Sequence, residues 1–151
     1  SDLIIVMKDG VVHQIGKPQE VYDEPANLFV AQFLGTPQIN VFSGEIRDGR
    51  LWIGEETVLD AAGRADRPVW VGIRPEGFLP DENGPLTCRM DRVEVMGRDV
   101  SVVSTHPQMT GRCVRSIVAS ENHFEPGAQT VRFRLKPYKV FLFDKESEER
   151  V

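Results

Sequence analysis

From Asn40 onward the sequence consists of short apolar stretches separated by clusters of Gly, Pro or Asn, and this pattern restricts the fold most. In the stretch 131–136, apolar and basic side chains alternate, which predicts a strand with one apolar and one basic face. Many short strands without helix-length patterns between them predict a mainly β region, folded as a closed or nearly closed antiparallel barrel. We expect strands at 41–47, 50–53, 68–73, 86–96, 100–105, 112–119, 130–135 and 140–143.

Residues 1–39 begin with a pattern of another kind. The apolar stretches 3–8 and 11–15 flank Asp9-Gly10, a pair that favours a type I′ turn, so they predict a β-hairpin. The first stretch is apolar at consecutive positions, as in strands that are covered on both faces. Nothing within residues 1–39 could cover both faces. We therefore expect the hairpin to be the trailing edge of a larger domain, with apolar surface exposed at Leu3, Ile5 and Phe29.

Two short helices are predicted after the hairpin. The first covers 17–23 and has Pro18 in its first turn; the second covers 26–34 and has Gly35 just past its end. We interpret residues 35–38 as a linker. The predicted organisation is a hairpin with two helices at 1–39 and a barrel domain at 40–151.

Composition excludes several classes of protein. The chain has 18 basic and 23 acidic side chains and a formal net charge of -5, which argues against a general nucleic-acid binder. Its longest apolar run, 3–7, is far shorter than the roughly 20 residues of a membrane span. The beginning of the sequence lacks the basic region of a signal peptide. The two cysteines, Cys88 and Cys113, form no C-x-x-C motif, so we expect thiols in a reducing compartment and a cytoplasmic protein.

No catalytic, cofactor-binding or metal-binding constellation can be assembled from the sequence. The three histidines, His13, His106 and His123, have no metal-ligand spacing, and no serine lies in a G-x-S-x-G motif. Gly10 and Gly16 resemble a phosphate-binding loop only superficially, because their spacing is one residue too long and Pro18 replaces the hydroxyl residue. We expect no catalytic, cofactor or metal residues in this chain.

A basic strand face near the end of the chain is the best candidate binding patch. It comprises Arg132, Arg134, Lys136 and Lys139, with Tyr138 and Phe141 nearby. Such a face suits single-stranded nucleic acid on an OB-type barrel. The alternative is that alternate residues of a strand face water, and we favour it because acidic residues follow at 146–149 and the net charge is negative.

Three segments together resemble one family. Residues 4–10, 14–22 and 25–35 resemble the sequence that follows the switch histidine in ATPase subunits of bacterial ABC importers of the maltose and glycerol-phosphate type. The string Pro-Ala-Asn-x-Phe-Val-Ala-x-Phe-x-Gly at 25–35 is specific. Residues 71–76, Val-Gly-Ile-Arg-Pro-Glu, resemble a signature of the regulatory domain in those subunits, and 140–144 resemble its last strand.

The resemblance implies a fold and a domain organisation. Residues 1–39 would be the C-terminal remnant of the nucleotide-binding domain, and 40–151 the transport-associated, OB-like regulatory domain. Lys17 departs from the family, where a helix-capping Thr is usual, so the first helix should begin less stably. The phosphate loop, ABC signature, catalytic Glu and switch His are absent from these residues. We therefore expect a non-catalytic chain whose parent protein binds Mg-ATP elsewhere.

The resemblance also implies partners. We expect a homodimer with a second copy, contact with membrane permease subunits through the parent ATPase, and possible binding of a regulatory protein, but no nucleic acid. The location would be cytoplasmic, peripheral at the inner face of the bacterial membrane. Two alternatives stay open at this point: an OB-type domain that senses an oxyanion or another small ligand, and a barrel that binds single-stranded nucleic acid.

The candidate residues for regulation or for a dimer interface follow from the same two signatures. They are Arg74, Pro75 and Glu76, and, in the last strand, Phe143 and Asp144. Pro75 fixes the backbone where a strand ends, which would position Arg74 and Glu76 as interface or relay residues. The alternative is an internal ion pair at the end of that strand.

Overall fold

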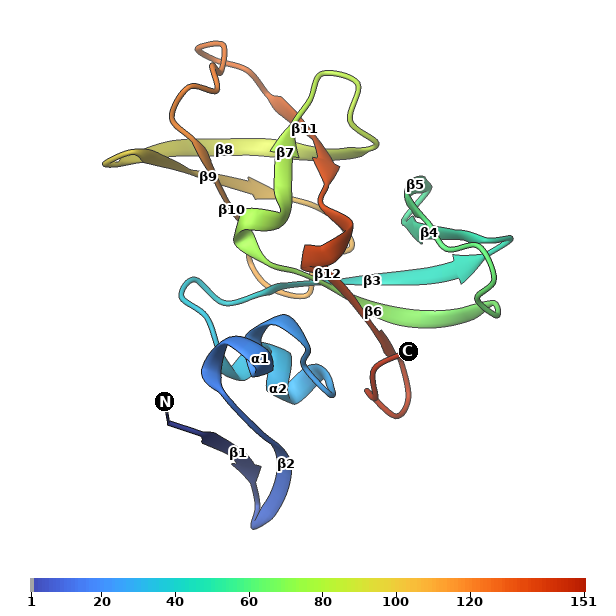
Figure 1. Cartoon of the computed structure of the whole chain (residues 1–151). Helices are drawn as coiled ribbons and strands as arrows, with labels where there is room; N and C mark the ends of the chain where they lie inside the picture. The colour runs from blue at the N-terminus through green and yellow to red at the C-terminus, as the bar shows by residue number, and fades with distance from the viewer. Residues whose placement is uncertain (1) are drawn as a thin grey trace.

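The chain is mainly β, as the sequence predicts, with a nearly closed antiparallel barrel of OB-like type. A computed structural model describes residues 2–151. In Figure 1 the hairpin and the two helices lie below the barrel, and the helices are the part nearest to it. No helix among the described residues has the length and apolar character needed to cross a membrane.

The N-terminal hairpin has the predicted turn. Strand β1 (Ile4–Lys8) pairs with β2 (Val11–Gly16), and both turn residues, Asp9 and Gly10, have positive φ angles. Of the three residues predicted to be exposed, Leu3 and Ile5 are exposed. Phe29 is only half-exposed, because its ring packs against His13 and the small cluster around Val6; Phe33, 55% exposed, is the more solvent-facing aromatic of α2.

The helices α1 (Pro18–Asp23) and α2 (Leu28–Phe33) lie where they are predicted. Lys17 makes no side-chain cap at the start of α1, in agreement with its departure from the family pattern. Asn27 caps α2, since its side-chain oxygen accepts a 3.0 Å hydrogen bond from the amide of Val30.

Among residues 2–151, ten strands form two five-stranded antiparallel sheets. In the first sheet the order is β10-β9-β8-β11-β7, and in the second it is β12-β6-β3-β4-β5. The strands at the two edges of the first sheet, β10 and β7, lie beside each other, so that this sheet nearly closes (Figure 1). The strand bounds are β3 Asn40–Arg47, β4 Arg50–Ile53, β5 Glu56–Asp60, β6 Arg67–Ile73, β7 Phe78–Pro80, β8 Leu86–Met96, β9 Asp99–Thr105, β10 Val114–Ala119, β11 Thr130–Leu135 and β12 Val140–Asp144.

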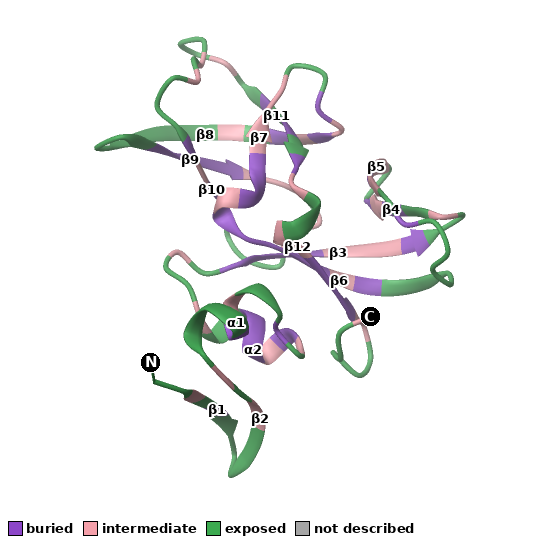
Figure 2. Ribbon diagram, viewed as in Figure 1, coloured by how far each residue is buried: buried purple, intermediate pink, exposed green. Residues whose placement is uncertain are grey.

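One apolar cluster lies between the two sheets. Phe42, Phe78 and Phe133 are its largest aromatic members, and all three are buried. Figure 2 shows this burial along the inner parts of the strands, whereas the hairpin β1–β2 and the far end of β8 are exposed. The alternation predicted in β11 is confirmed, because its residues are buried and exposed in turn from Thr130 to Leu135.

The strand predictions fail at three places. Strand β5 was not expected, because Glu-Thr-Val-Leu-Asp is short and follows a turn at Gly54-Glu55 without Pro or Asn. Strand β7 has three residues and ends at Pro80, so it has no recognisable alternation. Residues 112 and 113 lie outside β10, which begins at Val114. Two 3-10 turns, η1 (Pro75–Gly77) and η2 (Pro137–Lys139), join the sheets at β6 and at β12.

Candidate functional site

The side chain of Arg74 lies between the helices and the barrel. Arg74 follows β6 directly, and its side chain is buried, with 0% exposed. Its backbone belongs to the barrel, because its amide donates to the carbonyl of Lys139 and its carbonyl accepts from Gly77. Its guanidinium points the other way, toward the helices.

Three backbone carbonyls at the ends of both helices accept hydrogen bonds from this guanidinium. Nη2 donates to the carbonyl of Tyr22 at 2.8 Å, and Nη1 donates to the carbonyls of Ala31 at 2.9 Å and Leu34 at 3.0 Å. The last carbonyls of a helix have no partner within the helix, and a cation there is favourable. Arg74 therefore caps the C-terminal ends of α1 and α2 at the same time.

Aromatic rings complete the surroundings of Arg74. The centre of the guanidinium lies 3.9 Å from the centroid of the Tyr22 ring and 5.6 Å from that of Phe141. Burial lowers the pKa of Arg74, and the nearby Tyr22 and Glu76 act in the opposite direction. Since the ordinary pKa of arginine is so high, the side chain remains charged.

Glu76 is connected to Arg74 through Tyr22. The Tyr22 hydroxyl donates a 2.6 Å hydrogen bond to Oε2 of Glu76, and the Lys139 ammonium lies 3.2 Å from the same oxygen. Burial raises the pKa of Tyr22, and the hydrogen bond to Glu76 raises it further. Burial also acts to raise the pKa of Glu76, but the hydrogen bonds from Tyr22, from its own amide and from Lys139 outweigh it and hold this pKa below its usual range.

The candidates from the last strand lie elsewhere. Phe143 is buried opposite Trp70 and packs in a cluster with Leu28 of α2. Asp144 accepts hydrogen bonds from the amides of Glu146 and Ser147 and thereby organises the turn after β12. The hydrogen bond from Ser147 is the main cause of the lowered pKa of Asp144.

The final residues form a second connection to the helices, which the sequence interpretation did not identify. The carbonyl of Glu148 accepts a 3.0 Å hydrogen bond from the amide of Leu28, and the amide of Arg150 donates to the carbonyl of Ala26 at 3.1 Å. The guanidinium of Arg150 lies 2.7 Å from a carboxylate oxygen of Glu24 and stacks near Phe141. These are mostly backbone contacts, for which side-chain patterns give no signal.

Most residues of the predicted basic strand face have partners within the chain. Arg132 donates from Nε to the carbonyl of Gly84 at 2.8 Å, and Nε of Arg134 lies 3.4 Å from Asp81. Lys139 faces Glu76 at the buried arginine, while Lys136 is half-buried. Within residues 2–151, three of the four basic side chains therefore already have partners in the chain.

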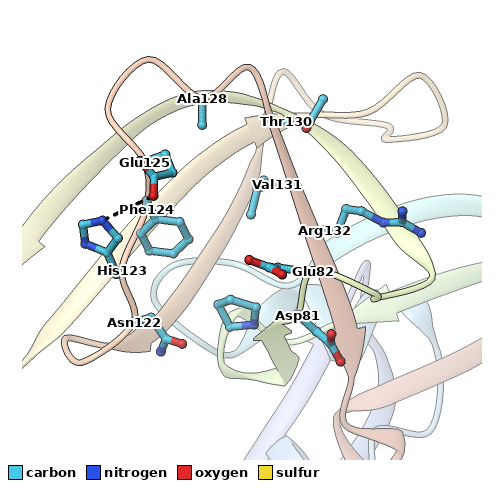
Figure 3. A pocket seen from close by; sticks show the side chains of 11 residues that line it. Asp81, Glu82, Asn122, His123, Phe124, Glu125, Ala128, Thr130, Val131 and Arg132 are labelled. Atoms are coloured by element: carbon cyan, nitrogen blue, oxygen red, sulfur yellow. Dashed lines mark ion pairs between the residues drawn. The ribbon is translucent and has the colours of Figure 1, made fainter.

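A cavity of about 370 Å³ opens beside Arg132 (Figure 3). Phe124 and Val131 supply apolar lining, and carboxylates come from Asp81, Glu82 and Glu125. Nε2 of His123 lies 3.9 Å from Glu125 at its rim. Three carboxylates would repel an oxyanion, so this cavity gives the oxyanion alternative no support.

Comparison with known proteins defines the family. The chain is 35% identical over 153 aligned residues to the sn-glycerol-3-phosphate import ATP-binding protein UgpC of Jannaschia sp. strain CCS1, with 100% of the chain and 42% of that protein covered. The chain is homologous to the C-terminal part of the ATP-binding subunits of ABC importers.

Other members of the family match over the same extent. UgpC of Ruegeria pomeroyi is 33% identical, with 100% of the chain and 42% of that protein covered. The osmoprotective compounds uptake ATP-binding protein GgtA of Synechocystis is 34% identical, with 100% and 45% covered. No protein-family model matches the chain. The chain thus spans about 42% of the length of these two UgpC proteins.

Proposed function

We propose that this chain is the C-terminal regulatory and dimerisation region of the ATP-binding subunit of an ABC importer. The observation that carries the proposal is the match of 100% of the chain to import ATP-binding proteins at 33–35% identity. The solute would be a sugar, a glycerol phosphate or a related small molecule. Mg-ATP would bind elsewhere in the parent polypeptide, and residues 40–151 would be the transport-associated regulatory domain, without catalytic activity.

The exposed face of the hairpin supports a place for residues 1–39 in a larger ATP-binding domain. Ile5 pairs with Ile15, and Met7 pairs with Val12, so these four side chains project from the same face. All four are exposed. Apolar side chains in such a group are unfavourable in water unless another surface covers them. We propose that the rest of the ATP-binding domain packs here and connects the chain to membrane permease subunits on the cytoplasmic side.

Dimerisation is tested by sedimentation equilibrium of the purified chain over a wide range of concentration. We expect a reversible monomer–dimer equilibrium with one isologous interface, as in most symmetric dimers. A strict monomer at high concentration contradicts the dimerisation part of the proposal. The same preparation is tested for turnover of Mg-ATP, for which we expect none; turnover that persists through further purification contradicts a non-catalytic chain.

The regulatory part of the proposal has its own test. The parent polypeptide is compared in reconstituted transport with a version in which residues 40–151 are removed. We expect ATP turnover to persist in the truncated subunit and its dependence on transported solute or on a regulatory protein to change. If both versions respond alike, residues 40–151 have no regulatory role.

A further inference from the structure

We propose that Arg74 is a coupling residue, which holds the helices α1 and α2 on the barrel so that the helices and the barrel move as one rigid body. This inference deepens the proposed function, because a regulatory domain must transmit its position to the ATP-binding domain. The physical coupling itself rests only on the contacts of Arg74. The two claims can therefore fail separately.

The position of Arg74 in the fold is the first reason. Its backbone is fixed to η1 and η2 of the barrel by hydrogen bonds with Gly77 and Lys139. Its side chain ends on carbonyls of two different helices, Tyr22 in α1 and Ala31 in α2. A shift of either helix relative to the barrel would lengthen a hydrogen bond on the same rigid guanidinium, so neither helix can move without disturbing the other.

The chemistry of the contact is the second reason. Among residues 2–151, Arg74 is the only buried residue with a charged side chain. Within the same residues its Nε has no hydrogen-bond partner, so the burial of this side chain is not fully compensated. A buried charge is weak evidence for a stabilising role, because an apolar side chain of similar volume is often at least as stable in its place. A role in orientation explains such an arrangement better than a role in stability alone.

The contacts of Tyr22 extend the coupling to the surface. The Tyr22 ring lies against Arg74, and its hydroxyl binds Glu76, which in turn faces Lys139 of η2. Helix α1 is thus connected to both 3-10 turns of the barrel. Glu76 and Lys139 are only part-buried, and a partner that binds there would act on the same contacts.

Hydrogen exchange of the 151-residue chain, followed by mass spectrometry of peptides, tests the coupling. Arg74→Met keeps the approximate volume of the side chain and removes all its donors. We expect exchange in residues 18–34 to become at least about tenfold faster, the effect of losing charge-assisted hydrogen bonds, while β8 and β9 keep their protection. Arg74→Lys keeps the charge but has no two-nitrogen fork, so its effect should be intermediate.

Arg132→Met is the matched control, because Arg132 also donates to a backbone carbonyl, that of Gly84, but remote from the helices. We expect this variant to leave exchange in residues 18–34 unchanged. Equal acceleration in the helices and in the barrel of Arg74→Met means that Arg74 only stabilises the whole chain, and it overturns the proposal. Unchanged exchange in residues 18–34 overturns it as well.

Tyr22→Leu is a second variant that tests the coupling if Arg74→Met does not fold. Tyr22 is half-buried, and its replacement removes the ring against Arg74 and the donor to Glu76 from the helix side. Faster exchange confined to residues 18–34 supports the coupling, and a uniform effect or none overturns it. None of these outcomes depends on dimerisation or transport, so the proposed function and this inference are tested independently.

Discussion

The hydroxyl of Tyr22 donates a 2.6 Å hydrogen bond to Oε2 of Glu76, across 54 residues of sequence and from a helix to the barrel. The same carboxylate oxygen faces the ammonium group of Lys139. This hydrogen bond is part-buried and its acceptor is charged, the combination in which a single hydrogen bond contributes most. Among residues 2–151, the polar side-chain contacts between α1 and the turns η1 and η2 all lie around Tyr22.

Loss of this hydroxyl should destabilise the chain. Tyr22→Phe keeps the ring against Arg74 but removes one donor from Glu76, and we expect the free energy of unfolding to fall by about 1.5–3 kcal/mol. Urea denaturation followed by tryptophan fluorescence measures the change. Tyr138→Phe is the control, because Tyr138 is exposed. Equal midpoints for the two variants would show that the hydrogen bond to Glu76 contributes nothing.

High pH should weaken the same contact. Burial and the hydrogen bond to Glu76 raise the pKa of Tyr22 in the folded chain above its ordinary value. The folded state then holds the proton more tightly than the unfolded state, so this stabilisation is complete below about pH 10 and decreases as the pH rises toward the folded pKa. Ultraviolet titration of phenolate should show one late component, which Tyr22→Phe removes. If that variant keeps the late component, the assignment is wrong.

Acid should reduce stability through His106. Its Nδ1 accepts a 3.0 Å hydrogen bond from the amide of Gln108, and burial lowers its pKa below the ordinary value although Glu56 acts to raise it. The folded state disfavours the proton, so stability is complete above about pH 6.5 and decreases as the pH falls toward the folded pKa.

His106→Asn isolates this effect, because the asparagine oxygen can replace Nδ1 as the acceptor and does not titrate. We expect the loss of stability between neutral and mildly acidic pH to be smaller in this variant, measured by urea denaturation at several pH values. The residual slope comes from carboxylates such as Glu76 and Asp144, whose lowered pKa values have the same sign of effect at lower pH. An unchanged slope at mildly acidic pH would exclude His106 as its source.

Helix α1 should be improved by a single substitution. Lys17 occupies the N-cap position in extended conformation and makes no side-chain hydrogen bond there. Lys17→Thr introduces an acceptor for the first free amides, and we expect a gain of about 0.5–1 kcal/mol in the free energy of unfolding. Asn27→Ala, which removes the existing cap of α2, should cause a loss of similar size. Thermal unfolding of both variants measures the two effects, and a Lys17→Thr chain that unfolds at the wild-type temperature contradicts the expectation.

The strands and turns of the barrel could be predicted because their signals lie in residues that are close together in the sequence. The alternation in β11 and the Asp9-Gly10 turn depend on residues next to one another in the chain, and both are confirmed. Strand β7 was not predicted, because its three residues become a strand only by pairing with β11, more than fifty positions away. A segment of three residues is too short to show the alternation of apolar and polar side chains that predicts a strand.

The candidate site was predicted less completely than the fold. The family signature singled out Arg74 and Glu76. The groups that Arg74 binds are backbone carbonyls of α1 and α2, and every residue has such a carbonyl, so residue types could not predict these contacts. Tyr22 was overlooked because, in the sequence, it reads as an ordinary helix residue. The basic strand face was grouped by alternation alone, and the loop at Asp81 and Gly84, which pairs with two of its members, is remote in the sequence. The domain boundary at residues 39 and 40 stays a prediction.

The turn after β12 limits which changes of chain length the protein can accept. Asp144 binds two successive amides in this turn, and Glu148, with φ of 63°, directs the chain back so that its carbonyl meets the amide of Leu28. One inserted or deleted residue between Asp144 and Glu148 would displace that carbonyl from the amide of Leu28 and Arg150 from Glu24. Natural relatives that share this connection should keep the same number of residues between positions 144 and 148.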